Sequence, residues 1–253
     1  MNIPIQLSLS SKIKLLKENI AKSWVRRQPR PFVCEELKLL YYPVPKAASS
    51  TVRRYLIEHG YADRRPPELT HNHIQHFQFP RATQREAREL IAEGYRSFAV
   101  VRNPYERIVS CYFDKIVGAG ANIGPSAGFV RYNHLLGRQI FRNDMTFPEF
   151  IRVISRIPDF AADAHFRCQR TFLPLQGTRV ALDCIIQMER FAEQFPAFLS
   201  SAGLPAWEIQ RENQTQRRDG ILQQFPGTIP FIRKRYESCF RLLGYSADEV
   251  PDV

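Results

Sequence analysis

Short runs of apolar residues divide the chain into segments that predict buried strands. The clearest runs cover residues 37–44, 98–101 and 182–187, and none of them shows a strict alternation of apolar and polar positions. A short apolar run without alternation is typical of a strand that is buried on both faces of a sheet. We therefore expect three such strands.

Helical periodicity and helix-terminal signals appear between these runs. Residues 51–60 show an apolar face and end in Gly60, a typical C-terminal glycine. Asn103 followed by Pro104 predicts the start of a helix that continues to about residue 117. Further helices are expected over residues 82–93, from the Thr-x-x-Glu capping box at Thr146, and over residues 189–202 and 229–243.

The order of these elements predicts an α/β fold. Because strands that alternate with helices form parallel sheets, we expect a P-loop-like parallel sheet with helices on both faces, in a single domain over residues 37–253. Residues 1–36 are predicted to form a basic N-terminal helical extension, and residues 118–144 a long functional loop or lid. Ligands of such folds bind at the carboxyl ends of the strands.

Net charge adds the expectation of an anionic ligand. The charge of +11 favours nucleotides, acidic glycans, nucleic acid or an anionic membrane, although a basic, well-solvated surface is the plainer explanation. Residues 12–30 are basic and partly amphipathic, which favours a solvated helix over peripheral membrane contact. The sequence shows neither a signal peptide nor a membrane span, which predicts a soluble protein of a reducing compartment.

The cysteines are scattered singly along the chain. No two of them have the spacing of metal ligands or of a disulfide framework, so we expect buried free thiols and no metal. They are Cys34, Cys111, Cys168, Cys184 and Cys239.

A loop suited to an anion joins the first predicted strand to the first predicted helix. It reads Pro45-Lys46-Ala47-Ala48-Ser49-Ser50-Thr51. Backbone N–H groups at a helix start attract an anion, the lysine adds positive charge, and the hydroxyl groups add donors. An ordinary helix cap is the alternative. Nucleotide triphosphatases need glycines in this loop and a lysine directly before the metal-binding Ser or Thr, and both features are missing.

A second motif follows the second predicted strand. It reads Val100-Val101-Arg102-Asn103-Pro104-Tyr105-Glu106-Arg107-Ile108-Val109-Ser110. Arg102 stands at the strand end and Ser110 about two turns into the helix, so both can contact one phosphate group. Arg107 is expected to pair with Glu106 or with a neighbouring strand.

In this order and about 50 residues apart, the two motifs resemble those of the Golgi carbohydrate sulfotransferases. That family includes the uronosyl 2-O-sulfotransferases and the HNK-1 and chondroitin sulfotransferase group. The resemblance continues loosely to about residue 245. It implies that residues 45–51 bind the 5′-phosphosulfate of 3′-phosphoadenosine-5′-phosphosulfate (PAPS), and that Arg102 and Ser110 bind the 3′-phosphate.

The resemblance implies a sulfotransferase domain over residues 37–253. Its expected reaction is in-line transfer of the sulfuryl group of PAPS to a carbohydrate hydroxyl, which leaves 3′-phosphoadenosine-5′-phosphate (PAP). Such a transfer needs a base for the hydroxyl proton and positive charge at the leaving phosphate, and Lys46 is the expected source of that charge. The chemistry requires no metal ion, and no cluster of acidic residues indicates one.

Three histidines are candidates for the base. His73 is favoured and His71 comes second, because their segment resembles the His-Gly-His segment that carries the base in the 2-O-sulfotransferases. His165 is the rival, since Asp163 can orient it. Exposed histidines without a catalytic role are the plainer interpretation. Two carboxylates are weaker candidates, Glu58 and Glu106.

Basic and aromatic side chains are expected around the acceptor and the nucleotide. Arginine forks and aromatic faces suit an acidic glycan. The acceptor candidates are Arg131, Arg138, Arg142, Arg167, Arg170, Tyr132 and Phe166. The resemblance also implies closure over the nucleotide by Arg217 and Arg218, which precede the last predicted helix together with Asn213 and Thr215.

Other functions remain as alternatives. They are a nucleotide-binding, kinase-like P-loop enzyme, a sulfotransferase for a small molecule that is not a carbohydrate, and a non-catalytic nucleic-acid-binding protein. A nucleic-acid partner is not expected, because the arginines form no basic stripe interleaved with aromatic residues. We expect a cytoplasmic enzyme, with a bacterial source as one hypothesis, or a protein of the Golgi lumen if the sequence is part of a longer, anchored chain.

Overall fold

A computed structural model describes residues 28–118, 140–208 and 220–253. Most of the predicted N-terminal extension and most of the predicted long loop therefore lie outside the described residues. Within the described ranges, no helix combines the length and the hydrophobicity that crossing a bilayer requires.

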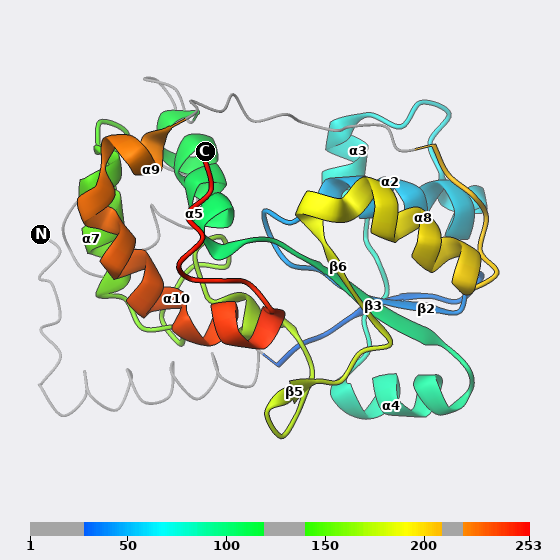
Figure 1. Cartoon of the computed structure of the whole chain (residues 1–253). Helices are drawn as coiled ribbons and strands as arrows, with labels where there is room; N and C mark the ends of the chain where they lie inside the picture. The colour runs from blue at the N-terminus through cyan, green and yellow to red at the C-terminus, as the bar shows by residue number, and fades with distance from the viewer. Residues whose placement is uncertain (1–27, 119–139, 209–219) are drawn as a thin grey trace, which may run out of the picture.

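A four-stranded sheet forms the centre of the described structure (Figure 1). Its order is β1-β2-β3-β6, and its strands are β1 (Phe32–Cys34), β2 (Leu39–Tyr42), β3 (Arg96–Val101) and β6 (Cys184–Gln187). Strands β2, β3 and β6 are parallel and confirm the three predicted strands. Strand β1 pairs antiparallel with β2 at one edge. It is only three residues long, too short for its apolar pattern to indicate a strand.

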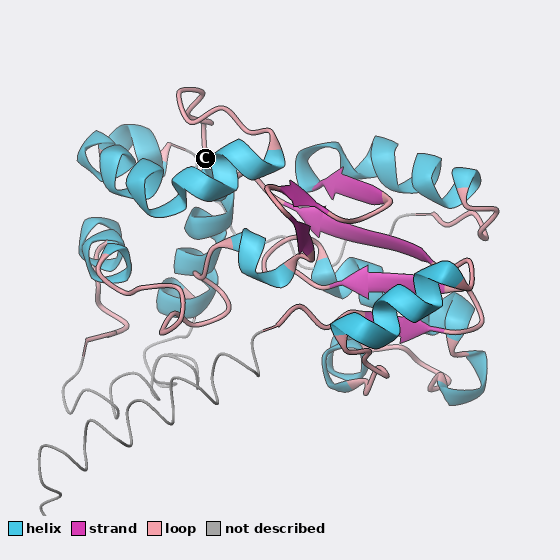
Figure 2. Ribbon diagram, turned by 90° about the horizontal axis from the view of Figure 1, so that it is seen from below, coloured by secondary structure: helices cyan, strands magenta, loops and turns pink. Residues whose placement is uncertain are grey.

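Helices cover both faces of this sheet, as expected for an α/β fold. Helices α2 (Ser49–Gly60) and α8 (Phe191–Ser201) lie on one face and α4 (Gln84–Ala92) on the other (Figure 1). Figure 2 shows the same arrangement from below, with the strands between helices. Strand β2 is buried throughout, and β3 is buried after its first residue, as strands covered on both faces must be.

A second group of helices lies beyond the carboxyl end of β3 (Figure 1). It contains α5 (Pro104–Tyr112) with the π-helical turn η2 (Phe113–Val117), α7 (Phe147–Ser155), α9 (Ile221–Gln224) and α10 (Ile229–Leu243). Helix α10 packs against both α5 and α7. The remaining described elements are short: η1 (Ala62–Arg64), α3 (His71–His76), η3 (Gln169–Phe172), β4 (Leu175–Gln176), β5 (Arg179–Val180), η4 (Met188–Arg190) and η5 (Pro226–Thr228).

The helix-terminal signals have the contacts that their sequences predict, with one exception. Asn103 Oδ1 accepts from the Tyr105 amide at 2.9 Å, and the Thr146 capping box is formed. Gly60 is the exception, because it is the last residue of α2 and does not adopt the left-handed conformation of a C-terminal cap. A Cβ atom at Gly60 would overlap Cys34 Sγ, so glycine is needed here for close packing of α2 against β1.

Two cysteines form a disulfide that the sequence did not predict. Cys168 and Cys239 are 71 residues apart and come together between the loop before η3 and helix α10. The expectation of five free thiols is therefore wrong for this pair, because only the fold brings them within bonding range. Cys34 and Cys111 are buried free thiols, and burial raises their pKa values to about 11 and about 12.

Candidate active site

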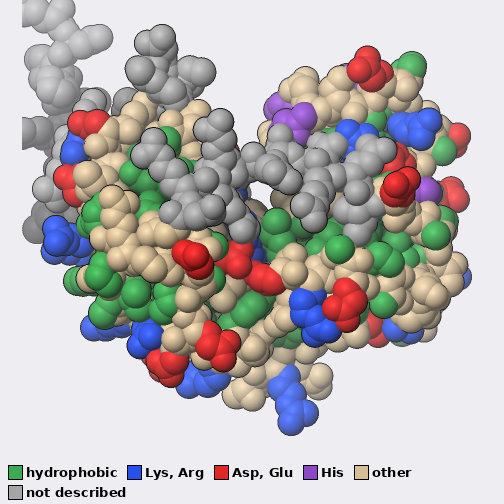
Figure 3. Space-filling model, turned by 45° about the horizontal axis from the view of Figure 1, so that its top comes forward, with side chains coloured by type: hydrophobic (Ala, Val, Ile, Leu, Met, Phe, Trp, Pro, Cys, Tyr) green, Lys and Arg blue, Asp and Glu red, His purple; other side chains and the backbone are tan. Residues whose placement is uncertain are grey.

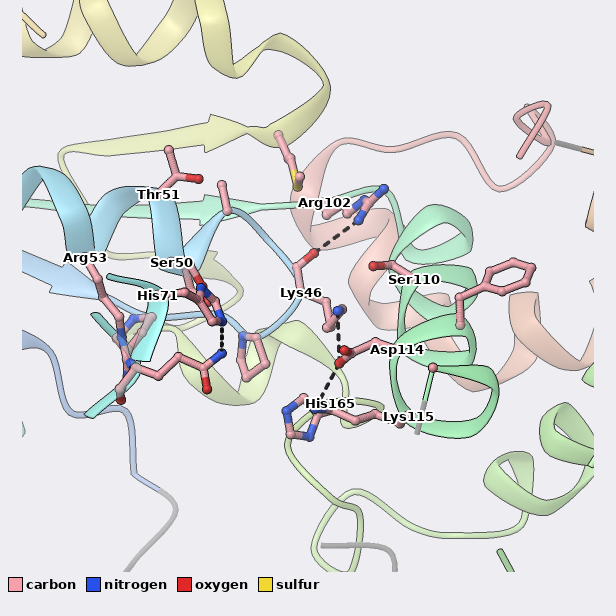
Figure 4. Close-up of a pocket in the computed structure, with 18 of the residues that line it drawn as sticks. Lys46, Ser50, Thr51, Arg53, His71, Arg102, Ser110, Asp114, Lys115 and His165 are labelled. Carbon is pink, nitrogen blue, oxygen red and sulfur yellow. Dashed lines mark hydrogen bonds and ion pairs between the residues drawn. The ribbon is translucent and has the colours of Figure 1, made fainter. Parts of the chain in front are cut away.

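A cavity of about 750 Å³ opens at the carboxyl ends of the parallel strands (Figure 4). The residues that directly follow β2, β3 and β6 are Pro43, Arg102 and Met188, and all three line it. Ligands of open α/β sheets bind at this edge. The cavity therefore lies where the sequence predicted a site.

The loop over residues 45–51 forms one wall of the cavity. Lys46 (φ 68°) and Ala48 (φ 50°) both adopt the left-handed backbone conformation that glycine usually takes, at a cost of roughly 1 kcal/mol each. The first helical bond of α2 runs from the Val52 amide to the Ala48 carbonyl at 3.0 Å. The amides of residues 49–51 therefore belong to the open N-terminus of α2, and these three residues line the cavity. This wall offers N–H groups, hydroxyl groups and a helix dipole to an anion.

Lys46 projects into the cavity and is held there by a carboxylate. Its Nζ lies 3.2 Å from Asp114 Oδ2, which is 2.9 Å from the Lys115 ammonium (Figure 4). Burial lowers the pKa of Lys46, and Asp114 opposes that shift. Burial raises the pKa of Asp114, but the two lysines outweigh it and keep the pKa below its ordinary value. The Asp114 carboxylate is therefore ionised at neutral pH and faces the Lys46 amino group.

Arg102 and Ser110 line the same cavity, as predicted. The Arg102 side chain is only 5% exposed, and its Nη2 donates to Glu106 Oε2 at 3.0 Å. Its Nη1 lies 3.5 Å from the Lys46 carbonyl, so the guanidinium sits beside the anion-binding loop. The two groups of residues that the sequence predicted to bind phosphate thus face one cavity.

Arg107 has a different role from the one that the sequence indicated. It is fully buried and donates to three backbone carbonyls, those of Pro45 (2.9 Å), Arg167 (2.8 Å) and Ala164 (2.9 Å). The prediction that it pairs with Glu106 or a neighbouring strand is wrong, since Glu106 pairs with Arg102. Burial lowers the pKa of its guanidinium. Arg107 ties the start of the anion-binding loop to residues 164–167.

His165 lies in the cavity wall near Lys115 (Figure 4). Its Nδ1 is 2.6 Å from Asp163 Oδ1, which also accepts the His165 amide at 2.9 Å. Burial raises the pKa of Asp163, but the contacts with His165 outweigh it and hold the pKa below its ordinary value. An ionised carboxylate therefore fixes this ring through Nδ1.

The other two candidate histidines lie on helix α3 rather than in a loop. His71 lines the cavity, with its Nε2 2.6 Å from Gln75 Nε2. His73 is not among the described residues that line the cavity. Its Nδ1 lies 3.0 Å from both the Thr70 hydroxyl and the Glu68 carbonyl, within the capping box of α3. The choice of base among the three histidines stays a prediction.

Several cavity residues were not predicted from the sequence. They are Arg53, Gln75, Phe113, Asp114, Lys115 and Val117. Asp114 had a usable signal, because it lies four residues after Ser110 and so on the same helix face. Arg53 likewise follows the anion-binding loop within the first turns of α2.

The predicted acceptor arginines and aromatic residues receive little support from the described residues. Phe166 is fully buried, so its prediction as a sugar-stacking face is wrong. Arg142 pairs with Asp144 at 3.0 Å, and the Arg167 guanidinium lies 4.5 Å from the Phe172 ring centre. The described residues Arg142, Arg167 and Arg170 do not line the cavity. The following lie outside the described residues: Arg131, Tyr132, Arg138, Asn213, Thr215, Arg217 and Arg218.

Surface charge and possible metal ligands add little to this picture. On the face drawn in Figure 3, Lys and Arg side chains lie apart from one another, among acidic and apolar ones. Among the residues that the structure describes, no three His, Cys, Asp or Glu side chains gather to hold a metal ion. That the reaction needs no metal remains a prediction.

Comparisons with known proteins agree with the two motifs. The model of the Sulfotransferase family matches residues 29–246. Carbohydrate sulfotransferase 10 of Gallus gallus is 24% identical over 254 aligned positions, which cover 88% of this chain and 67% of that protein. Carbohydrate sulfotransferase 10 of Danio rerio is 29% identical over 107 positions, 39% of this chain and 29% of that protein. No solved structure matches the chain. Because the family model spans most of the sequence, the chain belongs to the sulfotransferase family, as the loop around Lys46 and the motif around Arg102 predicted.

Proposed function

We propose that this enzyme transfers the sulfuryl group of PAPS to a hydroxyl group of a carbohydrate. The observation that carries the proposal is the convergence of Lys46, the N-terminus of α2, Arg102 and Ser110 on one cavity. The carbohydrate acceptor is inferred from the two relatives, which are named as carbohydrate sulfotransferases.

The residues of the cavity fit a nucleotide that carries phosphate groups at the 3′ and 5′ positions of its ribose. A volume of about 750 Å³ is within the usual range of small-molecule sites. Residues 45–51 would hold the 5′-phosphosulfate through amides, hydroxyls and the lysine, and Arg102 with Ser110 would hold the 3′-phosphate. When bound, PAPS supplies the sulfuryl group and the 5′-phosphate leaving group.

Lys46 would place positive charge at the oxygen where negative charge develops. A fixed charge in a partly buried site stabilises a transition state more strongly than one in water. The 3.2 Å contact with Asp114 holds the ammonium at the cavity wall beside residues 49–51. Asp114 thus opposes the effect of burial on the pKa of Lys46.

Among the three histidines, the geometry favours His165 as the base. If its Nδ1–H donates to the ionised Asp163, Nε2 carries the lone pair that accepts the hydroxyl proton, as in other Asp–His pairs. His71 is second, because its Nε2 contacts the Gln75 amide. His73 is third, since its Nδ1 takes part in the capping box of α3.

Titration calorimetry with PAP tests the donor half of this proposal. We expect PAP to bind without a metal ion, and Lys46→Ala and Arg102→Ala each to weaken binding by about 1–3 kcal/mol, the range for a lost charge-assisted hydrogen bond. Arg85→Ala is the matched control, because Arg85 is exposed on α4, pairs with Glu89 and does not line the cavity. Binding that is indifferent to both cavity substitutions, or a preference for Mg-ATP, would overturn the proposal.

A further inference from the structure

Gln169 holds the backbone of Arg102 with both ends of its side-chain amide. It is the first residue of η3 and is 1% exposed. Its Oε1 accepts from the Arg102 amide at 3.0 Å, and its Nε2 donates to the Arg102 carbonyl at 2.6 Å. One buried side chain therefore satisfies both backbone groups of a single residue.

Arg102 needs such a partner because it lies just beyond the sheet. The ladder between β3 and β6 ends where Val101 pairs with Gln187. A buried peptide group without a hydrogen bond is costly, and Gln169 supplies the donor and the acceptor that the next strand no longer offers. The pair of bonds fixes the orientation of the backbone from which the Arg102 side chain leaves.

The support behind Gln169 is itself rigid. The preceding residue, Cys168, is bonded to Cys239 of α10, and its amide donates to Asp159 Oδ1 at 3.1 Å. Next to Arg102 on the other side, the Asn103 amide donates to Glu189 Oε1 at 2.7 Å. Gln169 is thus held in place by its neighbours, and its side chain in turn holds the backbone at the end of β3.

We propose that Gln169 is a positioning residue that aims Arg102 at the 3′-phosphate of the donor, and so sets the preference for a 3′-phosphorylated nucleotide. This inference rests on the proposed function. The 5′ end of the site has supports of its own, because Arg107 holds the Pro45 carbonyl and residues 49–51 belong to the α2 N-terminus.

Calorimetry with two nucleotides separates these roles. PAP carries the 3′-phosphate, and adenosine 5′-monophosphate (AMP) lacks it. We expect the wild-type protein to bind PAP at least about tenfold more tightly than AMP. Gln169→Met, which keeps the side-chain length and removes both bonds, should weaken PAP binding about tenfold and leave AMP binding unchanged.

Gln194→Met is the matched control. The Gln194 side chain also bonds a strand-end backbone group, accepting from the Gln187 amide at 2.7 Å, but it does so at β6. We expect this variant to keep the preference of the wild type for PAP. In an Arg102→Ala background, Gln169→Met should cause no further loss of PAP affinity, since the two residues act as one unit.

The outcomes distinguish the inference from the proposed function. If the wild type binds PAP and AMP equally, the proposed function fails. If the wild type prefers PAP and Gln169→Met keeps that preference, only the inference fails. The same holds if Gln169→Met lowers the affinity for PAP and the affinity for AMP by the same factor. Should Gln169→Met not fold, the isosteric Gln169→Glu decides by the same criteria. It keeps the acceptor for the Arg102 amide and loses the donor, so the preference for PAP should fall.

Discussion

The two halves of the cavity are built differently. In the donor half, Arg102 is 5% exposed and Ser110 and Thr51 are each 8% exposed. In the acceptor half, His71 and Gln75 are exposed on the short helix α3, and Val117 is 46% exposed. The proposed donor site is therefore part of the packed framework, whereas the proposed acceptor side consists of side chains that can change without disturbing the core.

Long-range contacts to the backbone tie the proposed donor half to the packed framework. Arg107 and Gln169 come from different segments, and between them they hold Pro45 and Arg102, which border the two proposed phosphate sites. The acceptor half has more local contacts, such as His71 with Gln75 and Asp163 with His165. Substitutions in the donor half should accordingly affect donor binding and stability, whereas substitutions in the acceptor half should affect turnover.

The largest effect is expected from the base. His165→Ala should lower kcat between about a hundredfold and ten-thousandfold, because proton removal from the acceptor hydroxyl is lost, while PAP binding stays unchanged. Turnover with labelled PAPS and a glycan acceptor measures the first quantity, and calorimetry the second. His76→Ala is the control, since His76 lies on α3 outside the residues that line the cavity. Full activity of His165→Ala, with a loss in His71→Ala or His73→Ala, would move the base to α3.

An intermediate effect is expected from Arg107 in the donor framework. Arg107→Met should lower the free energy of unfolding by about 2 kcal/mol, because three buried carbonyls lose their charged donor. Urea denaturation measures this change. Arg85→Met on the exposed face of α4 should stay within about 0.5 kcal/mol of the wild type. Equal stability of the two variants would contradict the framework role of Arg107.

The smallest effect is expected from substitution of Asp114, which should change how the free energy of unfolding depends on pH in the acid range. Its pKa is held below the unfolded value of about 3.9, so the folded protein binds fewer protons there than the unfolded chain. The stabilisation is fully present above that value and is lost as the pH falls through the lower folded pKa. Asp114→Asn should therefore be less stable at neutral pH and lose less stability on acidification.

Urea denaturation at several pH values follows this difference. Asp63→Asn is the control, because Asp63 is exposed in η1. This variant should lose as much stability on acidification as the wild type. Parallel stability curves for wild type and Asp114→Asn would show that the Lys46–Asp114 pair contributes nothing to the pH dependence.

The sequence predicted well that the two motifs meet at one site, because the signals of each motif are local. A buried strand, a short polar segment and a helix follow one another at both Lys46 and Arg102. Periodicity indicates the strands and helices, and Asn103 marks the start of the second helix. Strand β1 was missed because three residues carry no periodicity.

The supporting contacts could not be predicted in the same way. Gln169 and Arg102 are 67 residues apart, and the disulfide joins residues 71 apart. A side chain that bonds a distant backbone group leaves no pattern in a single sequence, which is why Arg107 was assigned the wrong partner. For the histidines, the family resemblance favoured His73, whereas the fold brings His71 and His165 to the cavity.

The most direct test of the central claim is a crystal structure of the wild-type protein with PAP. We predict one PAP molecule in the cavity, with its 5′-phosphate on Lys46 and the amides of residues 49–51, and its 3′-phosphate on Arg102 and Ser110. A PAP molecule bound elsewhere, or bound here with its 3′-phosphate away from Arg102, would contradict the account of one cavity that holds both phosphates of the donor.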